Sequence, residues 1–282
     1  MGKENNKCKS KRYLFLVVLL VFCFFSSGCN KIDELEVKAG LKNTDFEYMK
    51  QGKIQKIVIQ STRDQGFRFI VTDQNVIRDL YDILSTAKTS SQKSSLEPDY
   101  VFEMDEGNNK IHKFNYIAGL ERKDSGNLYS DDKIYVVSKR IDNDIIKSYW
   151  TIRKPKDFEE IYYGSIIDTL KKYLKDKDKN KAIGINLKED VEAAKFMLST
   201  DLEDFRGNLK SEFKNVVIAD KDKEKYDVWV TIKTQGYKST LYKAIVTLWD
   251  KNEKSEKKYY IFDKYETGSW NVKVSEEKPD DF

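Results

Sequence analysis

The first thirty residues constrain this chain most, because they contain all three of its cysteines. What happens to them decides whether a disulfide can help to stabilise the rest of the chain. Five cationic side chains lie among the first twelve residues, and an uncharged apolar run extends from Tyr13 to Phe25. A membrane-spanning helix needs about twenty such residues, so this shorter run is typical of the apolar core of a signal peptide. Small residues at positions 26–28 follow directly, as at a cleavage site. We therefore expect residues 1–28 to be a signal peptide.

The stretch Ser26-Ser27-Gly28-Cys29 resembles the lipobox of bacterial lipoproteins. The resemblance implies cleavage between Gly28 and Cys29 and attachment of diacylglycerol to the Cys29 thiol. Ser26 departs from the family pattern, in which an aliphatic residue is usual at that position. The alternative interpretation is an uncleaved anchor with an incidental cysteine. Both place the remaining chain on the extracytoplasmic face of a cell membrane, and the first anchors it there through membrane lipid.

The composition of the chain changes once the leader is removed. The leader carries five of the 51 basic residues and, as Glu4, one of the 47 acidic ones, so 46 of each remain and the formal charge is zero. Without a basic excess there is no general electrostatic case for a nucleic-acid partner. Cys8 and Cys23 leave with the leader, and with Cys29 acylated no disulfide can form. The fold must therefore be held by its core alone, over about 250 residues.

Apolar patterning begins after a polar stretch, residues 29–51, which we expect to be a lipidated cysteine and a flexible tether with a reach of about 25 Å. Alternating apolar residues predict strands at 54–59, 67–71, 100–104, 112–116 and 134–137, and a further one at 149–152. Helical spacing predicts a helix over 76–87, capped by Thr72 or Asp73, and another over 158–174. This order favours an α+β unit over 52–174, with helices packed on one face of an antiparallel sheet.

Three segments of this unit carry a family resemblance: Ile54–Ile59, Ile70–Asp73 and Pro98–Phe102. They are similar to the YhfM-like domain of Gram-positive lipoproteins. The matching segments are structural patterns and contain no catalytic signature. The resemblance implies an envelope lipoprotein and brings no defined activity with it.

A charged linker is expected over 175–185. Three oxygen-bearing side chains in it have the spacing of a calcium loop: Asp176, Asp178 and Asn180. Lys181 occupies the position that needs glycine, and Leu187 the position of the bidentate glutamate. We therefore interpret the run as a solvated connection and predict no metal ligand there.

A second unit is predicted over 186–275, followed by a polar tail, 276–282. Asn186 and Glu189 form a capping box at the start of a long helix whose apolar stripe extends from Leu187 to Phe213. Alternating residues after it predict a four-stranded antiparallel meander. One long helix followed by a meander is a cystatin-like or NTF2-like layout, a comparison that rests on element order and is analogy only.

Catalytic chemistry is poorly represented in this sequence. His112 is the only histidine, and its place on a predicted strand in phase with Phe114 and Tyr116 favours a structural or surface role. A glycine-rich phosphate loop and a Gly-x-Ser-x-Gly motif are both absent from the sequence. We therefore assign no catalytic residue and no cofactor. Carboxylate pairs that cut glycosidic bonds are recognised by their separation in space, so the sequence leaves that possibility open.

Aromatic residues suggest one binding surface. Trp229 and Trp249 are out of phase with the apolar faces of their strands, so both are candidates for partner binding from the outer side of the second sheet. The alternative is that another layer of the protein covers them. Our leading hypothesis is a non-catalytic, membrane-anchored lipoprotein that binds an envelope protein or a peptidoglycan partner. The competing hypothesis is a carboxylate-dependent peptidoglycan hydrolase of the envelope.

Overall fold

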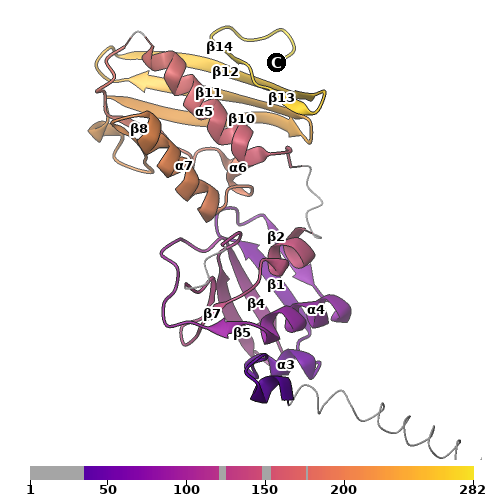
Figure 1. The fold of residues 1–282 in the computed structure, drawn as a ribbon. Helices are drawn as coiled ribbons and strands as arrows, with labels where there is room; N and C mark the ends of the chain where they lie inside the picture. Colours follow the sequence, from indigo (N-terminus) through magenta and orange to yellow (C-terminus); the bar gives the residue numbers. More distant parts are fainter. Residues whose placement is uncertain (1–34, 121–124, 148–153, 176) are drawn as a thin grey trace, which may run out of the picture.

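The computed structural model describes residues 35–120, 125–147, 154–175 and 177–282, which form two successive units, each with its own sheet and core (Figure 1). Both units combine helices with largely antiparallel sheets, so the predicted α+β class is confirmed. Within the described residues, no helix combines the length and apolar character that crossing a membrane requires. The predicted strand at 149–152 and the leader lie outside the described residues.

The first unit is an antiparallel sheet with its helices gathered on one side. Its elements are α3 (Glu47–Lys50), β1 (Lys56–Ser61), β2 (Arg68–Val71), α4 (Gln74–Ser85), β3 (Lys88–Thr89), β4 (Tyr100–Asp105), β5 (Ile111–Tyr116), β6 (Leu128–Tyr129), β7 (Ile134–Val136) and a π-helix, η1 (Ile141–Ile146). The strand order is β2-β1-β4-β5-β6-β7-β3. Asp73, one of the two residues predicted to cap α4, does so by accepting a hydrogen bond from Asn75 N (2.8 Å). Alternate residues of β1 and β4 enter the core, so the predicted hairpins are present in the expected register.

The predicted tether is wrong in its last part, because the chain joins the first core before residue 52. Phe46 and Met49 are buried there, at 1% and 3% exposure. The Asn43 side chain donates to the carbonyls of Leu84 and Ala87 at the end of α4, both at 2.9 Å. Two apolar residues separated by polar ones gave no periodic signal, which is why the sequence pattern missed them.

The second unit packs its longer helices on one face of a mixed sheet (Figure 1). Its elements are α5 (Phe158–Leu174), β8 (Ile183–Asn186), α6 (Val191–Ala194), α7 (Ser199–Glu212), β9 (Val216–Ile218), the 3-10 helix η3 (Lys223–Lys225), β10 (Val228–Lys238), β11 (Leu241–Asp250), β12 (Ser255–Glu266), β13 (Ser269–Asn271) and β14 (Val274–Ser275). Strands β10 to β13 form the predicted meander. Strands β8 and β9, which were not predicted, extend the sheet with two parallel pairs, β10–β8 and β8–β9.

Three assignments to the second unit need correction. Helix α5 was expected in the first unit, but its buried side chains belong to the second core. The predicted linker 175–185 contains most of β8, which is buried throughout. Lys181, which was expected to be solvated, pairs with a carboxylate, and its Nζ lies 2.5 Å from Asp250 Oδ2. The single helix predicted from Leu187 to Phe213 is divided into α6 and α7. It divides because Phe196 packs in the second core while Leu198, two residues later, packs against the first.

The predicted capping box is only partly present. The Asn186 side chain accepts from Lys188 N (3.0 Å) and donates to Glu189 (2.8 Å), but it lies at the end of β8 and closes a turn. A helix begins only at Val191, which is 69% exposed.

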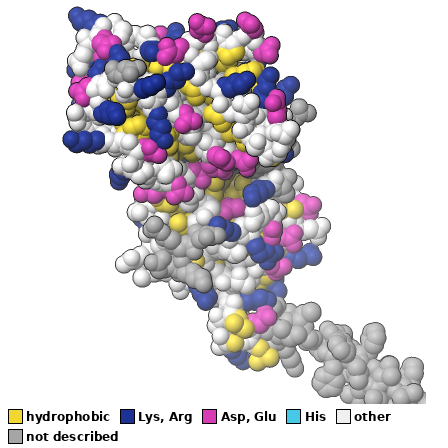
Figure 2. All heavy atoms as spheres, turned by 45° about the horizontal axis from the view of Figure 1, so that its top comes forward, with side chains coloured by type: hydrophobic (Ala, Val, Ile, Leu, Met, Phe, Trp, Pro, Cys, Tyr) yellow, Lys and Arg dark blue, Asp and Glu magenta, His cyan; other side chains and the backbone are white. Residues whose placement is uncertain are grey.

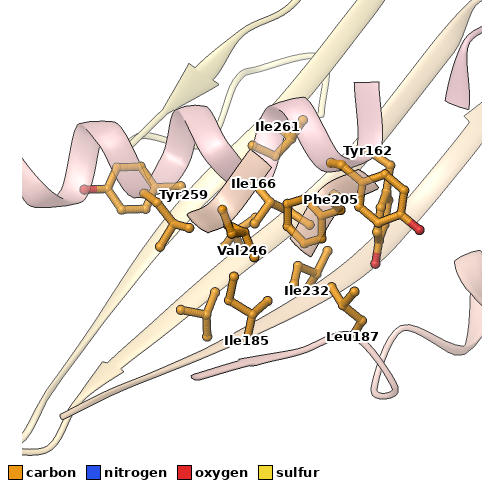
Figure 3. Packing of buried hydrophobic residues seen from close by; sticks show 14 of the residues in the cluster. Tyr162, Ile166, Ile185, Leu187, Phe205, Ile232, Val246, Tyr259 and Ile261 are labelled. Carbon is orange, nitrogen blue, oxygen red and sulfur yellow. The ribbon is translucent and has the colours of Figure 1, made fainter. Parts of the chain in front are cut away.

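The core of the second unit lies between α5, α7 and the inward positions of the strands. Figure 3 shows side chains from both helices and the sheet that point toward one another, among them Tyr162, Ile166, Phe205, Ile232, Val246 and Ile261. Burying one such side chain contributes about 1.5–3 kcal/mol. The only cysteines of the chain are residues 8, 23 and 29, so no disulfide can form within either unit. The stability of the two units therefore depends on packing and hydrogen bonds.

Two carboxyl groups are buried among these apolar side chains. Asp190 accepts from the hydroxyls of Thr234 (2.7 Å) and Tyr162 (3.2 Å). Asp263 on β12 is fully buried and accepts from Ser165 Oγ and Lys273 N, both at 3.0 Å. Burial raises the pKa of Asp263 to about 7, although both hydrogen bonds favour the ionised form.

Candidate functional site

The outer face of the second sheet, which we define by the outward residues of β10, β11 and β12, carries both predicted tryptophans. Trp229 and Trp249 are direct cross-strand partners. Their neighbours in sequence, Val228, Val230 and Leu248, belong to the core on the other side of the sheet. Since side chains alternate along a strand, both indole rings lie on the face opposite α5 and α7.

The two rings differ in exposure. Trp229 is only 6% exposed, because the Tyr226 ring lies 5.6 Å from it and the absence of a side chain at Gly184 lets both rings approach β8. The segment before β10 therefore covers Trp229. Trp249 is half-buried, and the Lys223 ammonium lies 5.6 Å from its ring centroid. Of the two tryptophans, Trp249 is thus the one whose ring a partner can reach.

Lysines dominate the charge of the outer face. The outward positions of the three strands include five lysines and two acidic residues: Lys233, Lys238, Lys243, Lys258, Lys264, Glu256 and Glu266. The ammonium groups of Lys243 and Lys264 lie 4.8 Å and 4.7 Å from the ring centroid of Phe262. Such cation–π contacts hold the charges at fixed places on the sheet. The outer face is therefore a basic and aromatic surface, although residues 29–282 as a whole contain equal numbers of basic and acidic residues.

The polar tail closes one corner of this face. The Phe282 ring packs against Tyr260, with centroids 5.3 Å apart, and Lys243 Nζ donates to Asp281 O. The tail was expected only as a polar extension, since a single aromatic residue gives no periodic signal. Its contacts on this face are with Lys243, Lys264, Tyr260 and Phe262, at the end of the face away from the tryptophans.

A second group of functional side chains lies where the two units meet. Asp99 of the first unit is 2% exposed, and its Oδ1 accepts from Ser199 N of α7 (2.8 Å) and from Arg63 (2.5 Å). Its Oδ2 accepts from Ala118 N (2.9 Å). The Ser199 hydroxyl donates to Glu97 O (2.6 Å) and accepts from Arg63 (2.6 Å). A carboxylate of one unit therefore partners an unpaired amide at the start of a helix of the other.

Hollows surround this junction. One of about 490 Å³ is lined by residues that include Arg63, Lys139 and Arg206. A second, of about 380 Å³, lies between α5 and α7 and is lined by residues that include Tyr163 and Asp201. Figure 2 shows acidic side chains gathered over the waist between the units. Acidic lining residues of the two hollows are Glu97, Glu159, Glu160, Asp201, Glu203 and Asp204.

The other residues singled out in the sequence take structural positions. His112 lies on β5, stacks on Tyr48 with ring centroids 4.0 Å apart, and its Nε2 lies 2.6 Å from Glu106 Oε1. Asp178 accepts from Asn180 N (2.9 Å) within an exposed turn. Cys29 and the cleavage site at Gly28 lie outside the described residues. The sequence missed the junction because Asp99 and Ser199 are 100 positions apart and belong to no motif.

Comparison with known proteins gives one family match. The model of the YhfM protein family matches residues 50–155, which contain the sheet and α4 of the first unit. The resemblance drawn from Ile54–Ile59, Ile70–Asp73 and Pro98–Phe102 is thereby confirmed. No curated protein and no solved structure matches the chain.

Adding a methyl group at Gly184 should disturb the tryptophan pair. A Cβ there would lie 2.7 Å from Tyr226 Cδ2 and 2.9 Å from Trp229 Cζ3, so Gly184→Ala should destabilise the protein by about 1–3 kcal/mol. Gly207→Ala is the matched control, because a Cβ at that helical position meets nothing within 4 Å and should stabilise by about 0.5–1 kcal/mol. Urea unfolding followed by tryptophan fluorescence measures both. Equal stability of the two variants would contradict the packing described here.

Removing the Asp99 carboxylate should weaken the junction. Asp99→Ala leaves Arg63 and the amides of Ala118 and Ser199 without their acceptor, which should cost about 3 kcal/mol in free energy of unfolding. The exposed pair of Asp222 and Lys225 gives the control, since Lys225→Ala removes a surface ion pair and should leave the free energy of unfolding nearly unchanged. Chemical denaturation of the two variants makes the comparison, and a loss of equal size in both would argue against a structural role for Asp99.

Proposed function

We propose that this chain is a lipid-anchored, non-catalytic protein of the extracytoplasmic cell envelope that binds an anionic cell-wall polymer on the outer face of its second sheet. The match to the YhfM family supports the relation to envelope lipoproteins that the sequence resemblance implies. The leader, with its lipobox-like end at Cys29, supports the anchor.

The observation that carries the binding proposal is the charge of the outer face. Five lysines and two acidic residues, Glu256 and Glu266, occupy outward positions of its three long strands, and one of these lysines, Lys258, lies 3.0 Å from Glu256. The face therefore carries an excess of positive charge, which acidic residues elsewhere in residues 29–282 balance. A row of ammonium groups attracts the phosphate or carboxylate groups that recur along an anionic polymer. The half-buried Trp249 ring adds a flat apolar contact beside them. We therefore commit to a polymer bearing phosphate or carboxylate groups as the partner.

The anchor is tested on the cellular protein. Cys29 should be the N-terminal residue and carry diacylglycerol, so that the protein partitions into detergent. Cys29→Ser should abolish lipidation and release an extended or unprocessed form, as measured by intact mass. The control is Cys23→Ser, which lies within the leader and should leave the mature mass unchanged. An intact leader on the native protein would contradict this proposal.

The binding surface is tested by charge reversal. Lys233→Glu with Lys258→Glu should lower co-sedimentation with purified cell wall about tenfold or more, since each surface charge near an anionic layer contributes about 1 kcal/mol. The matched control is Lys88→Glu with Lys210→Glu, the same charge change at exposed positions outside this face. Trp249→Ala should weaken binding by a smaller factor. Trp229 is unsuitable, because truncating a buried ring destabilises the sheet.

Two outcomes would count against the proposal. Equal loss in both double variants would show that net charge alone, and not the outer face, decides binding. Unchanged binding to cell wall stripped of its anionic polymers would point to the uncharged glycan or to a protein. A lytic zone in a zymogram of purified cell wall would favour the competing hydrolase.

A further inference from the structure

The hollow between α5 and α7 contains a polar side chain that the fold leaves unsatisfied. Tyr163 is 4% exposed, and its ring stacks on Phe205 with centroids 4.7 Å apart. Its hydroxyl is buried and has no hydrogen-bond partner among the described residues, and Tyr163 is one of the residues that line the hollow. A buried polar group without a partner costs about 1–3 kcal/mol. The hydroxyl is therefore a feature that packing alone does not explain.

The Asp201 carboxyl in the same hollow is also only half satisfied. Asp201 accepts a hydrogen bond from the backbone of Leu198, as expected for an acid in the first turn of a helix. Its Oδ2 is buried and has no partner among the described residues. Burial, followed by the neighbouring Glu159 charge, raises the pKa of Asp201 to about 6. Asp201 Oδ2 thus has unused hydrogen-bond acceptor capacity beside the hollow that Asp201 lines.

The charge of the hollow selects the kind of ligand. Four acidic residues line it, and the lining includes no lysine or arginine: Glu159, Glu160, Asp201 and Asp204. Acids in the first turns of α5 and α7 complement the helix dipoles, which accounts for their presence but not for the two unpartnered oxygens. A bare divalent ion is a poor fit. Among the described residues, no three acidic, histidine or cysteine side chains are arranged to hold a metal, and calcium takes six to eight oxygen ligands.

We propose that this hollow binds a primary ammonium group, with Tyr163 Oη and Asp201 Oδ2 accepting two of its three N–H bonds and Glu159 supplying further negative charge. An alkylammonium carries three donors on a narrow stem, which matches separate acceptors inside a space of about 380 Å³. Lys154, whose Nζ lies 3.2 Å from Glu159 Oε1, already shows the same ammonium–carboxylate contact at the rim. The site is formed by α5 and α7, the helices that cover the other face of the sheet, so it does not depend on the outer-face proposal.

The test is calorimetric titration of the full-length protein with n-pentylammonium, and with 1-pentanol as the neutral counterpart. The amine should saturate the site and the alcohol should not. Asp201→Asn keeps an acceptor for Leu198 N and should weaken amine binding at least tenfold. Tyr163→Phe retains the stacked ring and should weaken it about threefold. Glu203→Gln is the matched control on the same helix, outside this hollow, and should leave the affinity unchanged.

Two sources of the ammonium are separated by further probes. A lysine amide that binds more tightly than glucosamine would indicate an amine on a flexible side chain, and the reverse order an amino sugar.

The affinity for the amine should also fall as pH is lowered through 6, because Asp201 then becomes protonated. The charged groups near Asp201 are Glu159, Lys154 and Asp99. Absence of saturation below about 10 mM amine, or equal affinity in the wild type, Asp201→Asn and Tyr163→Phe, would overturn the proposal.

Discussion

The Asp99 carboxylate is the interaction on which the arrangement of the two units depends. It is buried and accepts hydrogen bonds from Arg63, Ala118 and Ser199, so it joins a loop of the first unit to the start of α7. Burial raises the pKa of Asp99 despite these donors, which shows that desolvation is a large opposing effect. Removing any one of these donors would leave the cost of desolvating the carboxylate less fully offset. The Leu198 side chain, one residue before α7, packs against the first core and fixes the helix start from the apolar side.

The second unit separates its charges between two faces. Helices α5 and α7 bring acidic first turns to the hollows near the junction, whereas the outward positions of β10 to β12 bring lysines to the opposite side. This separation follows from two periodicities in one chain. Helical spacing places Glu159 and Tyr163 on one face, and strand alternation places Lys233 and Lys258 on one face. The equal numbers of acidic and basic residues in 29–282 therefore conceal one acidic and one basic surface.

Patterns that depend on local sequence were predicted well. Alternation gave the hairpins of the first unit and the meander of the second, and Asp73 gave the start of α4. Features that depend on distant pairing were missed. The four residues of β8 follow a run of charged residues, so their sequence resembles the end of a linker. They form a strand because they pair in parallel with β10. Phe46, Lys181 and Asp99 likewise find their partners far along the chain, so no window of sequence reveals them.

The buried carboxyl of Asp263 links the second unit to the acidity of its surroundings. Its folded pKa of about 7 exceeds the value of about 3.9 for an unfolded chain, so the native state retains a proton that the denatured state releases. This group therefore favours the folded form in acid, and that advantage declines by about 1.4 kcal/mol per pH unit as the pH rises from 4 toward 7. Through this one carboxyl the second unit gains stability in mildly acidic surroundings and has lost that gain once they are neutral.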